Sequence, residues 1–246
     1  MPIMCAKRMG STGGTSTSIR LGPTSKKSRF DVDLVLLSLR DEYSKRCACK
    51  EDFPLVVVLQ HQLYAHLDNR TLVDRRIEEL VQSGCLRAVR VGAAEDETAL
   101  VDFEEYQEHA LSMAKNKLLM KKFLGSLKLH WNVVFSREQL NKLDFTEKEI
   151  SQLIRMGVLS LRKTVGSYFL SIPGASEYVR HLEAGRKALQ QALKKTKFKQ
   201  ILRDDFEKKK LARTRLSVSY LIDDALGKDV LEPNETTSGL MLTLTD

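Results

Sequence analysis

Between residues 145 and 174 the spacing of hydrophobic residues changes from helical periodicity to strict alternation. Ile150, Leu153 and Ile154 recur at helical spacing, which predicts a helix with one buried face. Two later runs alternate apolar and polar residues, which predicts two strands joined by a short turn. These runs are residues 159–162 and 168–172. A helix followed by such a hairpin is the expected order of a winged helix.

The ends of this predicted helix are marked by local chemistry. Thr146 can cap the first turn, and Glu149 can bond back to the backbone of Thr146. Phe145 and Ile150 stand where a hydrophobic staple would fix the entry of the chain. Gly157 supplies the left-handed turn with which many helices end. The helix is therefore expected to stop at Gly157.

The same order of elements occurs three times along the chain. It is found again in residues 71–103 and, in a more diverged form, in residues 217–246. The glycines that close the three helices, Gly84, Gly157 and Gly227, are about 70 residues apart, close to the size of one small domain. The sequence therefore predicts an α+β, mainly helical protein of three tandem winged-helix domains. The expected divisions are a disordered basic tail at 1–30 and domains at 31–112, 113–174 and 175–246.

Further helices complete the predicted domains. Apolar residues recur at helical spacing in each of them, and Pro54 suits a helix start. Trp131 and Phe198 are expected on the buried sides of their helices, and residues 103–117 are expected to bridge the first two domains. The predicted helices are residues 31–43, 54–67, 118–131, 176–195 and 198–210.

Composition excludes some classes of protein. Hydrophobic residues make up 42% of the chain, but no apolar run reaches about 18 residues and the N-terminus has no apolar core, so we expect neither a membrane span nor a secretory signal. The four cysteines are expected to be free thiols of an intracellular protein. They are Cys5, Cys47, Cys49 and Cys85. Cys47 and Cys49, with His61, His66 and Cys85 as companions, match no common zinc spacing, so no metal or cofactor is expected.

No catalytic constellation is found among the motifs. The chain has no Gly-rich loop after a strand and no VAIK, HRD or DFG sequence, which a protein kinase needs to hold nucleotide and metal. It also lacks GxSxG and HExxH. The five histidines are scattered and are expected to be structural. We therefore expect no catalytic residues and no enzymatic activity.

Charge is concentrated in one part of the chain. The net charge is +8, yet residues 180–215 hold thirteen Lys or Arg against four acids and the tail adds six more cations. A basic stripe on a mildly acidic body indicates a nucleic-acid binder, whereas a solvated helical face is the alternative. The predicted DNA-contacting residues are Arg75, Arg76, Arg162, Lys163, Arg186, Lys187, Lys194, Lys195, Lys197, Lys199, Lys208, Lys209 and Lys210.

Acidic residues elsewhere would repel a phosphate backbone. They gather in the predicted first turn between strands and in the third domain, where they favour contact with proteins instead. A chain that only bridges proteins is therefore a second hypothesis, because a fold alone does not fix function. The predicted protein-contacting residues are Glu95, Asp96, Glu97, Asp223 and Asp224.

Four short segments resemble a known family. From about Leu55 to the C-terminus the chain is similar to the family catalogued as serine/threonine-protein kinase 19. The segments that carry the resemblance are DNRTLVDR at 68–75, IPGA at 172–175, Gly185-Arg186 and TTSG at 236–239. Despite that name, the resemblance implies a nuclear protein of tandem winged helices that binds DNA, and a protein kinase is the rival class.

The resemblance also implies partners and a pathway. These are double-stranded DNA, with RNA as an alternative, and the stalled RNA polymerase II repair complex with Cockayne syndrome factors, UV-stimulated scaffold protein A and TFIIH. The implied role is to help place TFIIH in transcription-coupled nucleotide excision repair. A homodimer is a further family-level expectation.

Overall fold

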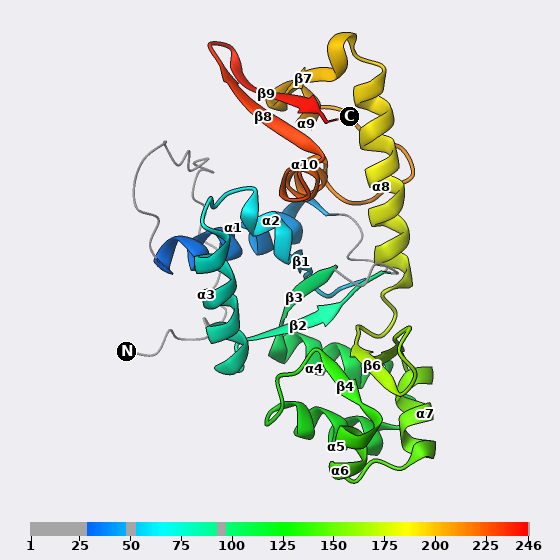
Figure 1. The fold of residues 1–246 in the computed structure, drawn as a ribbon. Coiled ribbons are helices and arrows are strands. Elements are labelled where there is room, and N and C mark those ends of the chain that lie inside the picture. Colours follow the sequence, from blue (N-terminus) through cyan, green and yellow to red (C-terminus); the bar gives the residue numbers. More distant parts are fainter. Residues whose placement is uncertain (1–28, 48–52, 93–96, 246) are drawn as a thin grey trace, which may run out of the picture.

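Three small antiparallel sheets divide the chain into three units with the same order of elements (Figure 1). The structure is a computed structural model that describes residues 29–47, 53–92 and 97–245 of the 246-residue chain. In each unit the first and second strands both pair with the third, so the order across the sheet is first, third, second. Helices precede the first strand and separate it from the second, and the second and third strands form a hairpin. This arrangement confirms the predicted α+β, mainly helical fold with three winged-helix units.

The first unit has its own hydrophobic core between the helices and one face of the sheet. Val73, Ile77 and Val81 place one side of its third helix in this core, and Asn69 caps the same helix by accepting a hydrogen bond from the backbone of Leu72 at 3.0 Å. Its elements are α1 (Arg29–Arg46), β1 (Val58–Leu59), α2 (Gln60–Tyr64), α3 (Arg70–Gln82), β2 (Leu86–Arg90) and β3 (Thr98–Asp102).

The second unit follows a connecting helix, α4 (Phe103–Met113). Its third helix has the predicted start, because Thr146 and Glu149 form the reciprocal capping box and Phe145 and Ile150 are both buried. Its other elements are α5 (Lys117–Leu127), β4 (Val134–Ser136), α6 (Arg137–Lys142), α7 (Glu147–Arg155), β5 (Leu159–Leu161) and β6 (Ser167–Leu170).

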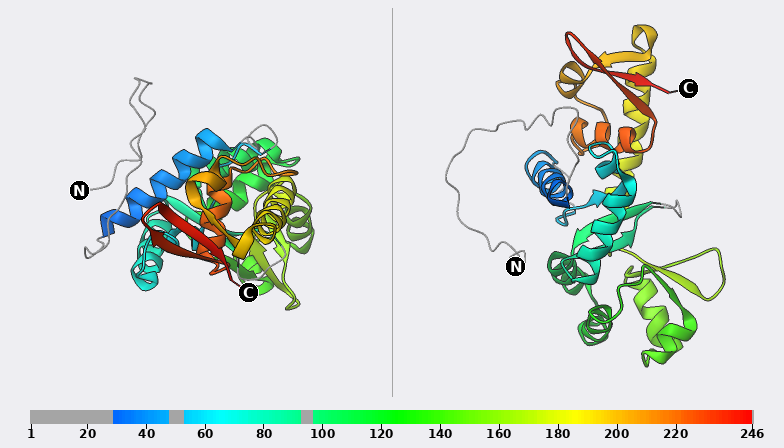
Figure 2. Two further views of the ribbon diagram at one scale, coloured as in Figure 1. Left: turned by 90° about the horizontal axis from the view of Figure 1, so that it is seen from above. Right: turned by 60° about the vertical axis from the view of Figure 1, so that its left-hand side comes forward.

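The third unit begins with the longest helix, α8 (Ser176–Lys194), which leads from the second unit past the third (Figure 2). A short 3-10 turn, η2 (Lys197–Lys199), then precedes the first strand. The remaining elements are β7 (Gln200–Leu202), α9 (Arg203–Glu207), α10 (Val218–Gly227), β8 (Leu231–Thr236) and β9 (Gly239–Leu244).

The closing turn of the repeat uses glycine in only two of the three units. Gly84 and Gly157 both have a φ of +77° directly after their helices, as predicted. In the third unit the left-handed residue is Asp229, with a φ of +57°, whereas Gly227 is the last residue of α10. Gly227 is instead required by close packing, because an added Cβ would lie 1.9 Å from the carbonyl oxygen of His61.

Several predicted elements are corrected by the structure. The segment at 54–67 is not one helix: its buried β-branched valines lead into β1, and only residues 60–64 are helical. Residues 103–117 contain α4 rather than a plain bridge. Trp131 is 48% exposed because α5 ends at Leu127. Residues 198–210 divide into η2, β7 and α9, which leaves Phe198 74% exposed.

The third unit packs on the first through α2 and α10. Gln62 donates a hydrogen bond to the carbonyl of Tyr220 at 3.0 Å, and the hydroxyl of Tyr220 donates to the carbonyl of Val57 at 3.2 Å. The hydroxyls of Tyr220 and Tyr178 lie 2.7 Å apart. Since these side chains are buried in a core that includes residues of all three units, the interfaces between units are part of the folded interior.

A buried arginine joins the first unit to the second. Arg87 on β2 is 3% exposed and donates to the carbonyls of Leu127, His130 and Asn132 at 3.3, 2.7 and 3.2 Å. Burial lowers the pKa of Arg87 to about 10. The guanidinium thus satisfies carbonyl groups at and just after the end of α5, where the helix dipole favours a cation.

Some expectations fall outside the described ranges. These are the tail at 1–30, apart from the start of α1, and the residues Cys5, Cys49, Glu95 and Asp96. Neither Cys47 nor Cys85 takes part in a disulfide within the described part of the chain. Within the described ranges no group of three or more His, Cys, Asp or Glu could hold a metal ion. The same ranges contain no helix with both the length and the apolar character needed to cross a bilayer.

Candidate nucleic-acid interface

The predicted acidic face of the third unit is buried in an ionic network. Asp224 is 1% exposed and accepts hydrogen bonds from Arg186 at 2.6 and 2.8 Å and from His61 at 2.7 Å. Arg186 also pairs with buried Glu97 at 2.6 Å, and Lys228 pairs with the same carboxylate. Burial opposes the charge on Asp224, but Arg186 and His61 outweigh it and lower the pKa of this carboxyl below its ordinary value.

A second network surrounds the neighbouring acid. Asp223 is also 1% exposed, accepts from Arg203 at 3.1 Å and lies 3.3 Å from His66. Burial lowers the pKa of Arg203, but Asp223 and Glu207 outweigh that effect and raise it. Asp223 and its neighbour on α10 therefore hold the units together.

This placement corrects the predicted protein-contacting face. Asp223, Asp224 and Glu97 are 1%, 1% and 5% exposed, so they cannot present acidic groups to a partner. The physical reason is that arginines distant in sequence neutralise them inside the fold. Exposed acids of the third unit remain on β8, at Glu232 and Glu235.

The helix that a winged helix normally places in the major groove is not accessible in the third unit. Residues 219–225 of α10 are all buried, and the helix packs against α2, α8 and α1. Figure 1 shows α10 enclosed between α2 and α8. The third unit therefore cannot insert this helix into a groove.

In the first unit the two adjacent arginines of α3 differ. Arg76 is 13% exposed and forms a bidentate pair with Asp33 at 2.7 and 2.9 Å, together with a bond to Glu79 at 3.0 Å. The hydrogen bonds that Arg76 donates to Asp33 raise the pKa of Arg76 above its ordinary value. The prediction that Arg76 and Arg186 contact phosphates is therefore wrong, because both form ion pairs inside the fold. Arg75 is 81% exposed, with Glu79 at 3.7 Å.

The outward side of α8 carries a line of cations. Arg180, Lys187 and Lys194 are exposed and stand two helical turns apart, so they project along one side of the helix over about 21 Å. The opposite side, which includes Tyr178 and Leu189, is buried. Arg180 pairs with Glu177 in the first turn of α8, and Glu183 is the one acid on the outward side between the first and last of these cations. Three cations against these two acids leave the line a net positive charge.

More cations lie beyond the end of α8. Lys195, Lys197, Lys209 and Lys210 are exposed. Lys208 is also exposed but pairs with Asp205 at 3.0 Å, and Lys199 is half-buried. The exposed cations of this segment thus outnumber its acids at the surface.

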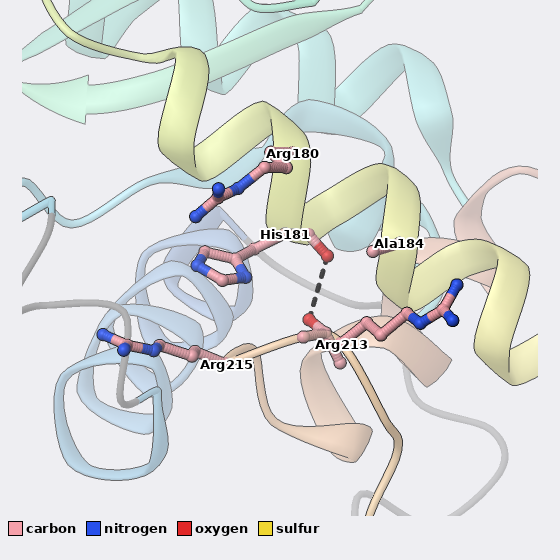
Figure 3. A pocket seen from close by; sticks show the side chains of 6 residues that line it. Arg180, His181, Ala184, Arg213 and Arg215 are labelled. Carbon is pink, nitrogen blue, oxygen red and sulfur yellow. Dashed lines mark hydrogen bonds between the residues drawn. The ribbon is translucent and has the colours of Figure 1, made fainter.

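A cleft opens beside the α8 line (Figure 3). Its volume is about 460 Å³, and its lining residues come from α8 and from the segment before α10. The hydroxyl of Thr214 connects these two segments by donating a hydrogen bond to the carbonyl of His181 at 2.9 Å. Figure 3 shows Arg180 and Arg215 extending to the same side, while Arg213 extends to the other. The lining residues are Arg180, His181, Ala184, Arg213, Thr214 and Arg215.

The three arginines of this cleft belong to the basic stretch at 180–215 but were not among the predicted DNA-contacting residues. In the sequence these arginines are marked only by the high density of positive charge. Residues 213–215 come to lie beside α8 only in the folded chain. The predicted residues of the second unit, Arg162 and Lys163, are exposed near the turn between β5 and β6. Arg162 lies over the ring of Phe169 at 5.4 Å. These wing residues form a separate group from those of α8.

Comparison with known proteins places this fold in a family. A family model described as inactive serine-threonine protein kinase 19 matches residues 40–244. The chain is 32% identical to winged helix repair factor 1 of Xenopus laevis over 76% of this chain and 74% of that protein. It is 29% identical to the Homo sapiens protein of the same name over 79% of this chain and 78% of that protein. The chain therefore belongs to the inactive serine-threonine protein kinase 19 family and is a non-catalytic member of it.

Proposed function

We propose that the chain is a non-catalytic protein that binds double-stranded DNA with little regard to sequence and takes part in DNA repair. The observation that carries the proposal is the line of exposed cations on α8, at Arg180, Lys187 and Lys194. The names of its relatives, winged helix repair factor 1, support the role in repair.

The geometry of the cation line suits a phosphate backbone. Duplex DNA carries one negative charge per about 1.7 Å of its axis, so a line of about 21 Å faces about a dozen backbone charges. Such contacts fix position without reading bases. The buried α10 favours the same conclusion, because the third unit offers no helix to the bases.

The finer role follows from the family resemblance. We propose a nuclear protein of transcription-coupled nucleotide excision repair that connects the stalled RNA polymerase II complex, with its Cockayne syndrome factors and UV-stimulated scaffold protein A, to TFIIH. The exposed Arg162 and Lys163 of the wing and Arg75 of α3 are proposed as further backbone contacts.

Fluorescence anisotropy with a labelled duplex tests DNA binding. The variant carries Lys187→Glu and Lys194→Glu, which reverse two exposed charges of the line. Each lost phosphate contact lowers the slope of log affinity against log salt by about one unit, so we expect a slope smaller by about two and weaker binding to every duplex sequence.

A matched control reverses two charges elsewhere. Lys117→Glu and Lys121→Glu change exposed lysines of α5 and give the same net charge as the first variant. We expect this control to retain the salt slope of the natural chain. Equal loss in both variants, or no loss in the first, would exclude α8 as the DNA-binding surface.

A protein-bridging scaffold without a DNA role is the second candidate. The exposed acids Glu232 and Glu235 on β8 favour it. It predicts no duplex binding even at low salt, and loss of partner capture when these two residues are changed to lysine.

A further inference from the structure

Phe198 is an aromatic residue held on the surface by an unusual backbone. Its side chain is 74% exposed, and it lies in η2, between α8 and β7. Its φ of 65° and ψ of 14° are left-handed, and the next residue, Lys199, has a φ of 52°. Left-handed backbone is rare for bulky residues and gathers at functional positions.

The turn that carries the ring is well ordered by hydrogen bonds. The backbone of Thr196 donates to the carbonyl of Leu193 at 2.9 Å, and its hydroxyl donates to the same carbonyl at 2.7 Å. The backbone of Lys199 donates to the carbonyl of Thr196 at 3.3 Å. Nearby Phe206 is fully buried and supplies an aromatic ring to the core of the third unit. Phe198 lies outside that core.

Cations surround the exposed ring. Lys194, Lys195 and Lys197 are exposed within four positions of Phe198. The ammonium of Lys197 lies 5.0 Å from the ring centroid, which is within the range of a cation–π contact. An aromatic ring among lysines is the chemistry that binds a single-stranded nucleic acid, because the lysines attract phosphates while the ring stacks on a base.

We propose that Phe198 stacks on an unpaired base, so that the protein prefers DNA with locally opened strands over continuous duplex. This inference rests on the proposed function, because it assigns a DNA structure to the surface that begins on α8. In a closed duplex each base face is covered by its neighbours, so the ring gains a partner only where bases are unpaired. The lysines serve both kinds of DNA equally.

Competition between two DNA probes tests the proposal. One is a duplex, and the other is the same duplex with a run of mismatched bases at its centre. Stacking on one base contributes about 1–3 kcal/mol, so Phe198→Ala should weaken binding to the mismatched probe by about 5-fold to about 150-fold. Its affinity for the duplex and both salt slopes should stay unchanged, because no charge is removed.

Three matched variants separate stacking from other effects. Phe198→Asn keeps a residue that accepts left-handed backbone and removes the ring, so it should behave as Phe198→Ala. Phe198→Leu keeps apolar bulk and should lose the preference, whereas Phe198→Trp should retain it. Thermal melting should be unchanged for Phe198→Leu and Phe198→Trp, since the side chain is exposed, and slightly higher for Phe198→Asn, since Asn accepts the left-handed backbone.

The outcomes distinguish this inference from the proposed function. If the natural chain binds both probes equally, or if Phe198→Ala weakens both equally or neither, base stacking by Phe198 is excluded while DNA binding stands. If the natural chain binds neither probe at low salt, both ideas are wrong.

Discussion

Replacing Gly227 with alanine tests the packing of the third unit on the first. The new Cβ would lie 1.9 Å from the carbonyl oxygen of His61, 2.5 Å from its carbonyl carbon and 3.1 Å from the backbone nitrogen of Gln62. All three atoms belong to the backbone of α2, so no side-chain rotation can relieve the contact. The two helices must move apart by about 1 Å or more to reach ordinary van der Waals separation.

The expected loss of stability follows from this displacement. Overpacking a well-packed interior usually costs about 1–3 kcal/mol. Separation of α2 and α10 also strains the buried hydrogen bond from Gln62 to Tyr220, which contributes about 1 kcal/mol. The helical preference of alanine returns up to about 1 kcal/mol. We therefore expect the free energy of unfolding to fall by about 1–3 kcal/mol.

Urea denaturation followed by circular dichroism measures the change, with two other glycines as controls. Gly125 lies in α5 with nothing within 4 Å of an added Cβ, so Gly125→Ala should raise stability by about 0.5–1 kcal/mol. Gly185→Ala would meet only side-chain atoms of Leu221 and Thr214, the nearest at 2.7 Å, and should be intermediate. If Gly227→Ala unfolds at the same urea concentration as the natural chain, α2 and α10 do not pack as described.

Four further predictions concern single interactions. Asp224→Asn should lower the free energy of unfolding by about 3–5 kcal/mol in urea, because Arg186 is left with an incompletely paired buried charge. Because the pKa of Asp224 is lower in the folded state than its ordinary value, its stabilisation is fully present above the ordinary pKa and is lost as pH falls through the depressed pKa. As the pH is lowered in acid, the melting temperature of the natural chain should therefore fall more steeply than that of Asp224→Asn. Arg87→Met should cost about 2–4 kcal/mol in urea, because buried carbonyls lose their donor. Thr146→Ala should cost about 1 kcal/mol through loss of the α7 cap, and an unchanged urea midpoint would contradict it.

The sequence predicted what depends on neighbouring residues. The capping box of Thr146 and Glu149 involves contacts within a few positions. The left-handed glycine after the helix is equally local and occurs in two units, at Gly84 and Gly157. The first strand of each unit was missed because it has two or three residues and is defined by pairing with a strand 30 or more positions later. Such pairing leaves little local periodicity.

The candidate site was predictable as a charge density but not as a surface. Counting charges identified the basic stretch at 180–215, yet it could not reveal that Arg186 and Arg203 pair inside the fold with Asp224 and Asp223. Their partners are separated by 38 and 20 positions. Phe198 was expected inside because aromatic residues usually are, and its left-handed backbone has no marker in sequence.

The burial of α10 has a mechanical consequence. Its ionic and hydrogen-bonded contacts with α2 and α8 fix the first unit against the third. The continuous helix α8, about 28 Å long, connects the second unit to the third. Ligands bound by the wing of the second unit, between β5 and β6, and by the surface of α8 are therefore kept at a fixed separation. When both hold the same DNA, any mismatch of curvature must be taken up by bending the DNA rather than by flexing the protein.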